Sequence, residues 1–186
     1  MVKSTTIAGL LLGALALPGC SNQTEDKQAE AAGAQSAGEK NLADALGKQP
    51  DLTTLAAAIK ATGLNGVFAN AGSYTLLAPN NAAFAKLGDK AAALNAPEQR
   101  AALTAVVRDH MVPGYLTRDD IAKAIEAGGG KPVKMRTLGA GELSFAKDGT
   151  AITVTAADGA SATIAGTAVP AGPSIALPVD GVLKKV

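Results

Sequence analysis

Residues 74–87 constrain the fold more than any other stretch of the sequence. The stretch opens with a short apolar run, which is consistent with a buried strand. Pro79 has no backbone N–H to donate, so we expect the strand to end there. Asn80 or Asn81 can then accept a hydrogen bond from a free amide and begin a helix. Phe84 lies on the apolar face of that helix, so its ring is expected to fill the core beside the strand.

The composition favours one globular domain with an N-terminal extension. A chain of 186 residues can build a domain that buries about 70% of its unfolded surface, which is enough for a core without disulfides. The 17 basic and 16 acidic residues nearly cancel, and no basic stripe points to nucleic acid. Cys20 is the only cysteine, so no disulfide can form within the chain.

Residues 1–19 are expected to be a lipoprotein signal peptide. Lys3 is followed by an apolar run of the length of a signal core, too short to span a bilayer. The sequence Leu-Pro-Gly-Cys ending at Cys20 resembles a bacterial lipobox, in which the cysteine becomes the lipidated first residue of the mature protein. Several acyl chains on one residue would anchor the protein stably. The alternative is an ordinary secretory signal with a stray cysteine.

Residues 20–40 are expected to combine the lipidated Cys20 with a disordered tether. The segment is rich in Gln, Glu, Ala, Ser and Gly and has no large apolar side chain, so it cannot bury enough surface to fold. As a random coil it would span about 25 Å on average. Ser21 rather than aspartate follows the cysteine, which by resemblance to bacterial lipoprotein sorting predicts outer-membrane delivery in a cell with two membranes.

The globular domain is predicted to occupy residues 41–186 and to open with helices. Asp51 is expected to cap a helix that Gly63 ends. Asn95 is predicted to begin a capping box for the next long helix. Thr117 is predicted to cap a later one.

Towards the C-terminus the apolar period changes to two, which predicts strands. Asp-Gly pairs at 148–149 and 158–159 predict hairpin turns. Residues 162–169 are expected to form a strand of small residues and residues 174–184 the last strand. Pro178 in that last strand predicts a sheet edge or a bulge.

The corner at residues 74–87 resembles the first signature motif of the fasciclin domain family. That motif usually reads threonine, an apolar pair, Ala-Pro-Thr-Asn and then Ala-Phe. Thr75, Pro79, Asn81 and Phe84 match it in register, and Asn80 stands where the family often has threonine.

A second segment extends the resemblance. His110, Pro113 and Gly114 match a landmark that usually reads Tyr-His-Val-Val-Pro-Gly. Asp109 stands in place of the tyrosine. The landmark is usually followed by a short strand, which would fall at residues 115–116.

The end of the chain resembles the closing motif of the family, usually Asn-Gly-Val-Ile-His-Val-Ile-Asp and then Val-Leu. Asp180, Val182 and Leu183 match, and Leu177 stands at the family histidine. The resemblance covers residues 41–186. It implies a single α+β domain in which N-terminal helices pack on a mostly antiparallel β-wedge.

His110, the only histidine, is the first candidate for chemistry. It could act as a general base, a metal ligand or a pH switch. Because it shares the apolar face of a helix, we expect it to be buried and structural. A zinc site needs several His or Cys ligands, so neither a metal nor a cofactor is expected. The sequence has no Gly-x-Ser-x-Gly elbow to present a serine to His110.

Acidic and glycine clusters are weaker candidates. Asp109, Asp119 and Asp120 could in principle supply paired carboxylates, but helix-capping and solvated roles are favoured. Residues 128–130 lack the spacing of a phosphate-binding glycine motif and are interpreted as a helix stop. Residues 184–185 are interpreted as a solvated terminus.

The function predicted by the resemblance is non-catalytic binding or adhesion in the cell envelope. The membrane would be reached through acylated Cys20, and the partner would be an unknown envelope, cell-surface or matrix component rather than nucleic acid. Receptor-binding residues of animal fasciclin domains are not transferred, because the tyrosine and the second histidine are missing. One alternative is a periplasmic small-ligand binding protein, which needs an apolar pocket of roughly several hundred Å³. The other is a hydrolase, which needs His110 exposed in a cleft.

Overall fold

The computed structural model describes residues 41–186 apart from 70–71, 95 and 186. The predicted signal peptide, the lipidation site at Cys20 and the tether therefore lie outside the described residues. Within the described part of the chain, no helix has the length and apolar character needed to cross a membrane.

Helices dominate the first half of the described chain and strands the second. The helical segments, with short 3-10 turns labelled η, are α2 (Leu42–Gly47), η1 (Pro50–Leu52), α3 (Thr53–Thr62), α4 (Asn65–Ala69), α5 (Asn81–Ala85), α6 (Asp89–Leu94), η2 (Pro97–Gln99), α7 (Arg100–Asp109) and α8 (Arg118–Ala127). The strands are β1 (Tyr74–Pro79), β2 (Met111–Pro113), β3 (Val133–Arg136), β4 (Glu142–Asp148), β5 (Ala151–Ala156), β6 (Ser161–Thr163), β7 (Val169–Ala171) and β8 (Ser174–Val179).

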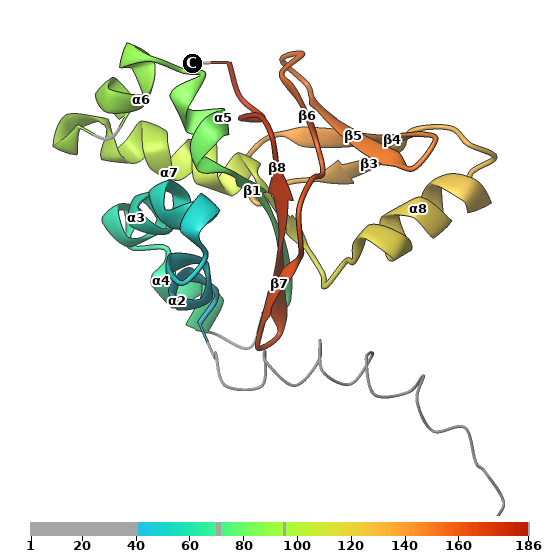
Figure 1. The fold of residues 1–186 in the computed structure, drawn as a ribbon, viewed down its shortest axis with the longest axis horizontal. Coiled ribbons are helices and arrows are strands. Elements are labelled where there is room, and N and C mark those ends of the chain that lie inside the picture. The colour runs from blue at the N-terminus through green and yellow to red at the C-terminus, as the bar shows by residue number, and fades with distance from the viewer. Residues whose placement is uncertain (1–40, 70–71, 95, 186) are drawn as a thin grey trace, which may run out of the picture.

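The strands form two four-stranded sheets. In the first, ordered β2-β1-β8-β7, β1 pairs antiparallel with β2 and parallel with β8. The second, ordered β3-β4-β5-β6, is antiparallel throughout. Figure 1 shows the N-terminal helices on one side of the first sheet and the second sheet on the other. The predicted α+β class, with helices packed on mostly antiparallel strands, is confirmed.

The first sheet is buried on both faces, because its side chains alternate between two cores. Leu76 and Ala78 of β1 join a cluster formed with α2, α3 and α4. Leu77 points the other way, into a cluster formed with the second sheet and with Ile121 and Ile125 of α8. In a strand that is covered on both faces, the side chains on each face are buried and therefore apolar. This explains the continuous apolar run of β1.

The corner after β1 forms as predicted, with Asn80 rather than Asn81 as the helix cap. The Oδ1 atom of Asn80 accepts a hydrogen bond from the N–H of Ala83 at 2.7 Å. Asn81 instead reaches back along the chain: its Oδ1 accepts from the N–H of Thr54 at 3.0 Å and its Nδ2 donates to the carbonyl of Pro50 at 2.9 Å. The corner is thereby joined to the start of α3.

Replacing Asn80 with alanine should lower the free energy of unfolding by about 1 kcal/mol, because a free amide of α5 loses its acceptor. Asn80→Ser keeps an oxygen at the cap and should remain close to the wild type. Urea denaturation of the three proteins measures the difference. Equal stability of the alanine and serine variants would show that the cap contributes nothing.

One predicted helix start is wrong, and a second falls on a residue outside the described part of the chain. Asp51 lies inside η1, and α3 follows with no side-chain cap of its own, because the Asn81 side chain serves the N–H of Thr54 instead. Asn95 lies outside the described residues, and α7 begins only at Arg100, after η2. The end of α3 at Gly63 and the cap of α8 at Thr117 are confirmed, and in the structure Thr117 forms a capping box with Asp120.

Among the strands, both Asp-Gly hairpins are confirmed, whereas three other predictions need correction. Residues 115–116 are not a strand; the short strand is β2, because α7 ends at Asp109. Residues 162–169 are not one strand: residues 162–163 end β6, residue 169 begins β7 in the other sheet, and residues 164–168 belong to neither strand. The last strand ends at Val179, and it is interior rather than an edge. Pro178 is tolerated there because pairing with β7 has already ended at Ala176.

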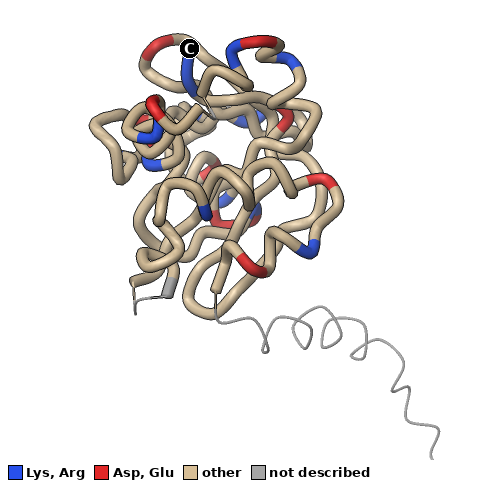
Figure 2. The backbone as a smooth tube through the Cα atoms, turned by 90° about the vertical axis from the view of Figure 1, so that its left-hand side faces the viewer, with Lys and Arg blue, Asp and Glu red and all other residues tan. Residues whose placement is uncertain are grey.

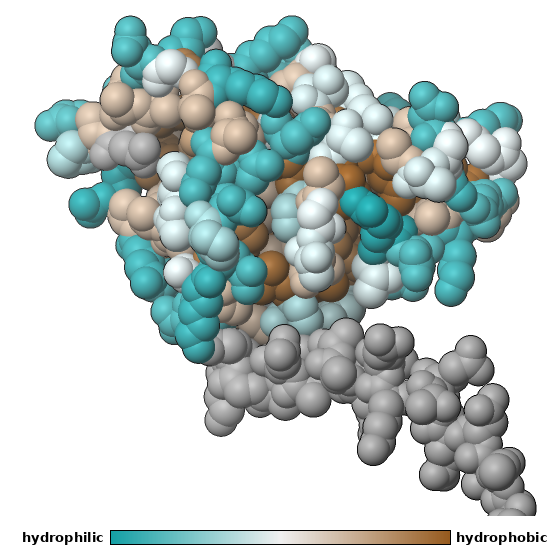
Figure 3. Space-filling model, viewed as in Figure 1, coloured by the Kyte–Doolittle hydropathy of each residue, from teal (hydrophilic) through white to brown (hydrophobic). Residues whose placement is uncertain are grey.

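Acidic and basic residues are intermixed (Figure 2), whereas strongly apolar residues are largely covered in the view of Figure 3. Figure 2 shows basic and acidic positions interspersed along the described chain. Figure 3 shows hydrophilic residues over most of one face, with strongly apolar residues visible only in recesses near the centre of the view. Tyr115, at 43%, is the one large hydrophobic residue classed as exposed in the described part of the chain.

Candidate functional site

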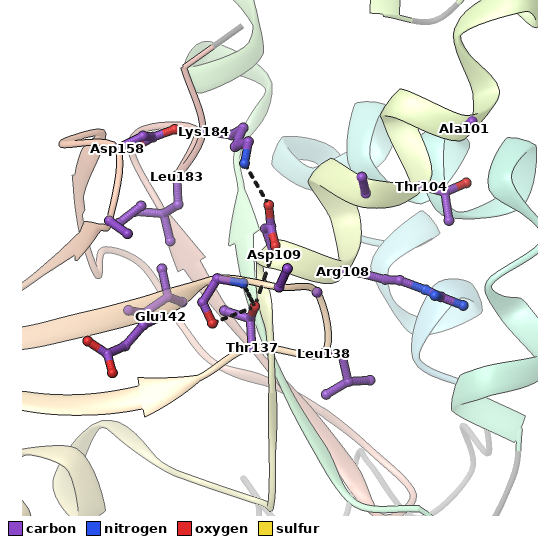
Figure 4. Close-up of a pocket in the computed structure, with 17 residues that line it drawn as sticks. Ala101, Thr104, Arg108, Asp109, Thr137, Leu138, Glu142, Asp158, Leu183 and Lys184 are labelled. Carbon is purple, nitrogen blue, oxygen red and sulfur yellow. Dashed lines mark hydrogen bonds and ion pairs between the residues drawn. The ribbon is translucent and has the colours of Figure 1, made fainter.

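A hollow of about 680 Å³ opens where the two halves of the domain meet, and we call it the groove. One wall is the outer face of α7, from Ala101 to Asp109. The others are the turn between β3 and β4 (137–141, here the glycine turn), the end of β5 with the residues after it (156–158), and residues 183–184 near the C-terminus. Figure 4 shows these segments converging around Asp109.

The glycine turn packs tightly on the C-terminal end of α7. The N–H of Gly139 donates to the carbonyl of Arg108 at 3.2 Å, and the N–H of Leu138 donates to the carbonyl of Met111 at 2.8 Å. A Cβ atom on Gly139 would lie only 2.0 Å from Oδ1 of Asp109. A larger residue here would displace the Asp109 carboxylate, so glycine allows the turn to approach the helix this closely.

Asp109 and Lys184 close one side of the groove with an ion pair. Lys184 Nζ lies 3.0 Å from Asp109 Oδ2, and the Asp109 side chain is only 13% exposed. The hydrogen bond to Asp109 and its negative charge raise the pKa of Lys184 above the usual lysine value. The Lys184 side chain is 42% exposed, as expected of a solvated terminus, but its Nζ is held in place by Asp109. Thr137 Oγ1 lies 3.5 Å from Asp109 Oδ1, so the pair is also linked to the glycine turn.

The other carboxylates that line the groove also take part in hydrogen bonds or ion pairs. Asp158 accepts backbone hydrogen bonds from Ala160 at 2.9 Å and Lys185 at 2.8 Å. Burial opposes ionisation of Asp158, but these hydrogen bonds outweigh it and lower the pKa of the carboxyl. Glu142 Oε1 lies 3.0 Å from Lys134 Nζ.

His110 lies at the junction of α7 and β2 and is only 1% exposed, so its predicted burial is confirmed. Its Nε2 accepts the N–H of Leu183 at 2.8 Å, which requires Nδ1 to carry the ring proton and donate to the carbonyl of Val106 at 2.7 Å. Burial lowers the pKa of His110 to about 4, opposed in part by the Val106 carbonyl and by Asp109. The ring is therefore neutral at pH 7 and joins the C-terminal segment to α7.

This arrangement suits binding better than proton transfer. Both ring nitrogens of His110 are occupied by backbone groups, and Asp109 is held by Lys184. Asp120 belongs to the capping box of α8, where the Thr117 hydrogen bonds lower its pKa, and Asp119 is exposed on the same helix. Among the described residues, no group of three His, Cys, Asp or Glu side chains is placed to hold a metal ion.

The interior offers little room for a small ligand. An apolar hollow beside Phe84 and His110 holds only about 10 Å³, roughly the space of one water molecule. The groove has the volume of a ligand site, but Ala101, Arg108 and Ala140 on its walls are exposed to solvent. It is a surface feature rather than an enclosed apolar pocket.

The motif residues hold the fold together instead of lining one site. Thr75 is fully buried; its hydroxyl donates to the carbonyl of Gly114 at 2.7 Å and accepts from the N–H of Leu116 at 2.8 Å. Asp180 Oδ1 accepts from the N–H of Thr163 at 2.7 Å, and its carbonyl accepts from Lys86 Nζ at 2.8 Å.

Two prolines and Gly114 determine the path of the chain between these hydrogen-bonded positions. Pro79 ends β1 and is buried, whereas Pro113 is exposed at the end of β2, opposite Tyr74. Gly114 then turns with φ 96°. The motif residues therefore have structural roles in the fold and do not form a common binding site.

The groove itself was missed by reasoning from the sequence. Its walls come from segments far apart in the chain, and most of its residues are small. One local signal was present: Gly139 and Gly141 flank a single alanine in the region where an apolar period of two predicts strands, a pattern that marks a turn with close backbone approach.

Comparison with known proteins agrees with this fold. The sequence profile of a family described as "Fasciclin domain" matches residues 50–185. Protein sll1483 of Synechocystis sp. is 29% identical over 118 residues, which are 63% of this chain and 66% of that protein.

A FAS1 domain pair from the insect cell adhesion molecule Fasciclin I has a similar structure, with a TM-score of 0.66 and 14% identity. The similarity covers 78% of this chain and 51% of that one. This chain thus spans just under two thirds of the cyanobacterial protein and about half of the insect domain pair.

Proposed function

Because this chain belongs to the fasciclin domain family, we propose that it is a lipid-anchored, extracytoplasmic binding or adhesion module without catalytic activity. Domains of the family generally serve as non-catalytic binding modules. The insect protein with a similar structure is a cell adhesion molecule, which supports extending an adhesive role to this chain.

The observation that carries the proposal is the state of His110. A general base must reach its substrate, whereas this ring is buried and both of its nitrogens are bonded to the backbone. Leu183, which His110 holds, forms part of the groove wall. The histidine supports a surface that can bind, and offers no free nitrogen for chemistry.

The positions of the chain ends favour a partner outside the membrane. In Figure 1 the first described helix, α2, lies at the lower end of the domain and the C-terminal end lies at the top. Residues 183–184 of the groove are close in sequence to that upper end. A tether anchored at Cys20 would lead into α2, at the end of the domain opposite to its C-terminal end.

Replacing Cys20 with serine should release the protein from the membrane fraction or leave it as an uncleaved precursor, because the acylation site is gone. The domain should remain folded, with the same thermal unfolding midpoint as the wild type. Fractionation of the producing cells, together with mass spectrometry of the N-terminal peptide, measures both. Wild-type protein that carries no lipid mass on Cys20 would contradict the anchor.

A capture experiment with envelope extracts tests the proposed binding function. The full Cys20→Ser chain, immobilised on beads, should enrich a defined envelope component over blank beads and over a heat-unfolded sample of the same chain. Failure to enrich any component over these controls would overturn the binding function.

A further inference from the structure

The charges around the groove are not all neutralised in the same way. Each carboxylate on its walls is held by a lysine or by backbone N–H groups, as described above for Asp109, Glu142 and Asp158. The guanidinium of Arg108, in contrast, makes no hydrogen bond or ion pair with any described residue. Figure 4 shows it pointing away from the ion pair of Asp109 and Lys184.

A second unpaired guanidinium lies across the glycine turn. A smaller hollow of about 390 Å³ shares Thr137 and residues 139–142 with the groove, and Arg136 lines it. Arg136 is also exposed and has no partner among the described residues. Arg108 lines only the groove and Arg136 only the smaller hollow, so the two guanidiniums flank the turn. Among the charged side chains that line the two hollows, these two guanidiniums are therefore the ones without a partner in the described part of the chain.

The groove walls also present several aliphatic side chains, and the glycine turn offers free backbone groups. The walls carry Ala101, Ala105, Leu138, Ala156 and Leu183. The N–H and carbonyl of Ala140, at the tip of the turn, have no partner within the described chain. An extended polypeptide can use such groups through its own backbone while its side chains enter the hollows.

The lining favours a polypeptide over a sugar. None of the described residues that line the groove or the smaller hollow is aromatic. The apolar faces of sugar rings usually pack on the electron-rich faces of aromatic rings, and this surface has none to offer.

We infer that the groove and the adjoining hollow bind an extended segment of a partner protein in which carboxylate side chains alternate with aliphatic ones. Arg108 and Arg136 contact the carboxylates, since the planar guanidinium matches a carboxylate with paired hydrogen bonds. The aliphatic side chains lie on the alanine and leucine walls. This inference rests on the proposed binding function and specifies the chemistry of the partner.

The test uses the full Cys20→Ser chain and a fluorescein-labelled peptide in which leucine alternates with glutamate, with fluorescence anisotropy as the readout. We expect saturable binding that weakens with added salt, as contacts between exposed charges do. The analogue with glutamine in place of glutamate should bind far less. The double variant Arg108→Gln/Arg136→Gln should bind the glutamate peptide about tenfold more weakly than the parent chain.

The matched control is Arg100→Gln/Lys131→Gln. It removes the same charge from two exposed positions outside both hollows, one of them on α7 itself. We expect its affinity to remain within twofold of the parent chain, about what a change in long-range charge alone produces. Thermal unfolding of both variants confirms that each is folded.

Three results with these probes would overturn the inference. One is equal weakening in the two double variants, and another is no binding of the glutamate peptide by the parent chain. The third is Arg108- and Arg136-dependent binding of polygalacturonate or of phosphatidylglycerol vesicles in preference to the peptide, which assigns the guanidiniums to another class of partner. If Arg108→Gln/Arg136→Gln still captures the same envelope component on beads, the binding function stands and only this inference fails.

Discussion

Replacing Phe84 with alanine should lower the free energy of unfolding by about 3–5 kcal/mol. The ring is only 8% exposed and belongs to the cluster between the helices and the first sheet. It lies beside the hollow of about 10 Å³ that Leu55, Leu103 and His110 also line, so its loss would enlarge an existing void. The rigid corner formed by Pro79 and Asn80 leaves the neighbouring chain little freedom to close that space.

Denaturant unfolding of wild type, Phe84→Ala and Tyr115→Ala provides the comparison. Tyr115 is the exposed aromatic residue, so its loss should change stability by no more than about 0.5 kcal/mol. Similar, small effects of both substitutions would show that the corner after β1 is not part of the core.

His110 should make the stability of the domain depend on pH between 6.5 and 4. Its pKa falls from 6.5 in the unfolded chain to about 4 in the folded protein, chiefly through burial. In this window the unfolded chain binds a proton that the folded chain does not. The stabilisation is therefore complete above pH 6.5 and is lost as the pH falls towards 4, by about 3 kcal/mol in total.

His110→Gln isolates this contribution. The variant should lose about 1–3 kcal/mol at pH 7, because the carbonyl of Val106 and the N–H of Leu183 lose a well-placed partner. Between pH 6.5 and 4 its stability should fall less steeply than that of the wild type, since the carboxyl groups are common to both proteins. Parallel curves would show that the histidine is not held neutral by the fold.

The same variant separates a structural histidine from a catalytic one. Wild type and folded His110→Gln are compared on esterase, glycosidase, peptidase and phosphatase substrates. We expect no turnover by either. Turnover by the wild type that disappears in His110→Gln would support the hydrolase instead.

The sequence predicts those parts of the fold that depend on neighbouring residues. Pro79, Asn80 and Phe84 specify the corner within a few positions, and Thr117 with Asp120 specifies the start of α8. The burial of His110 followed from its place on an apolar helical face.

Features that depend on distant contacts were not predicted. The parallel pairing of β1 with β8 joins residues about 100 positions apart, which no local pattern reveals. Asn81 accepts a hydrogen bond from the N–H of Thr54, and Lys184 forms an ion pair with Asp109. Each partner is distant in the sequence, so neither role could be inferred from neighbouring residues. The groove belongs to this class, because its walls exist only after α7, the glycine turn and the C-terminal segment have met.

Site-specific photo-crosslinking in the producing cell tests the central claim, that the domain binds an envelope partner through the groove. A photoreactive amino acid replaces Ala140, which is exposed at the tip of the glycine turn, or Ala57, which is exposed on α3 outside the groove. We predict a discrete adduct with an envelope component from position 140 and none from position 57. No adduct from position 140, or the same adduct from both positions, would contradict the account.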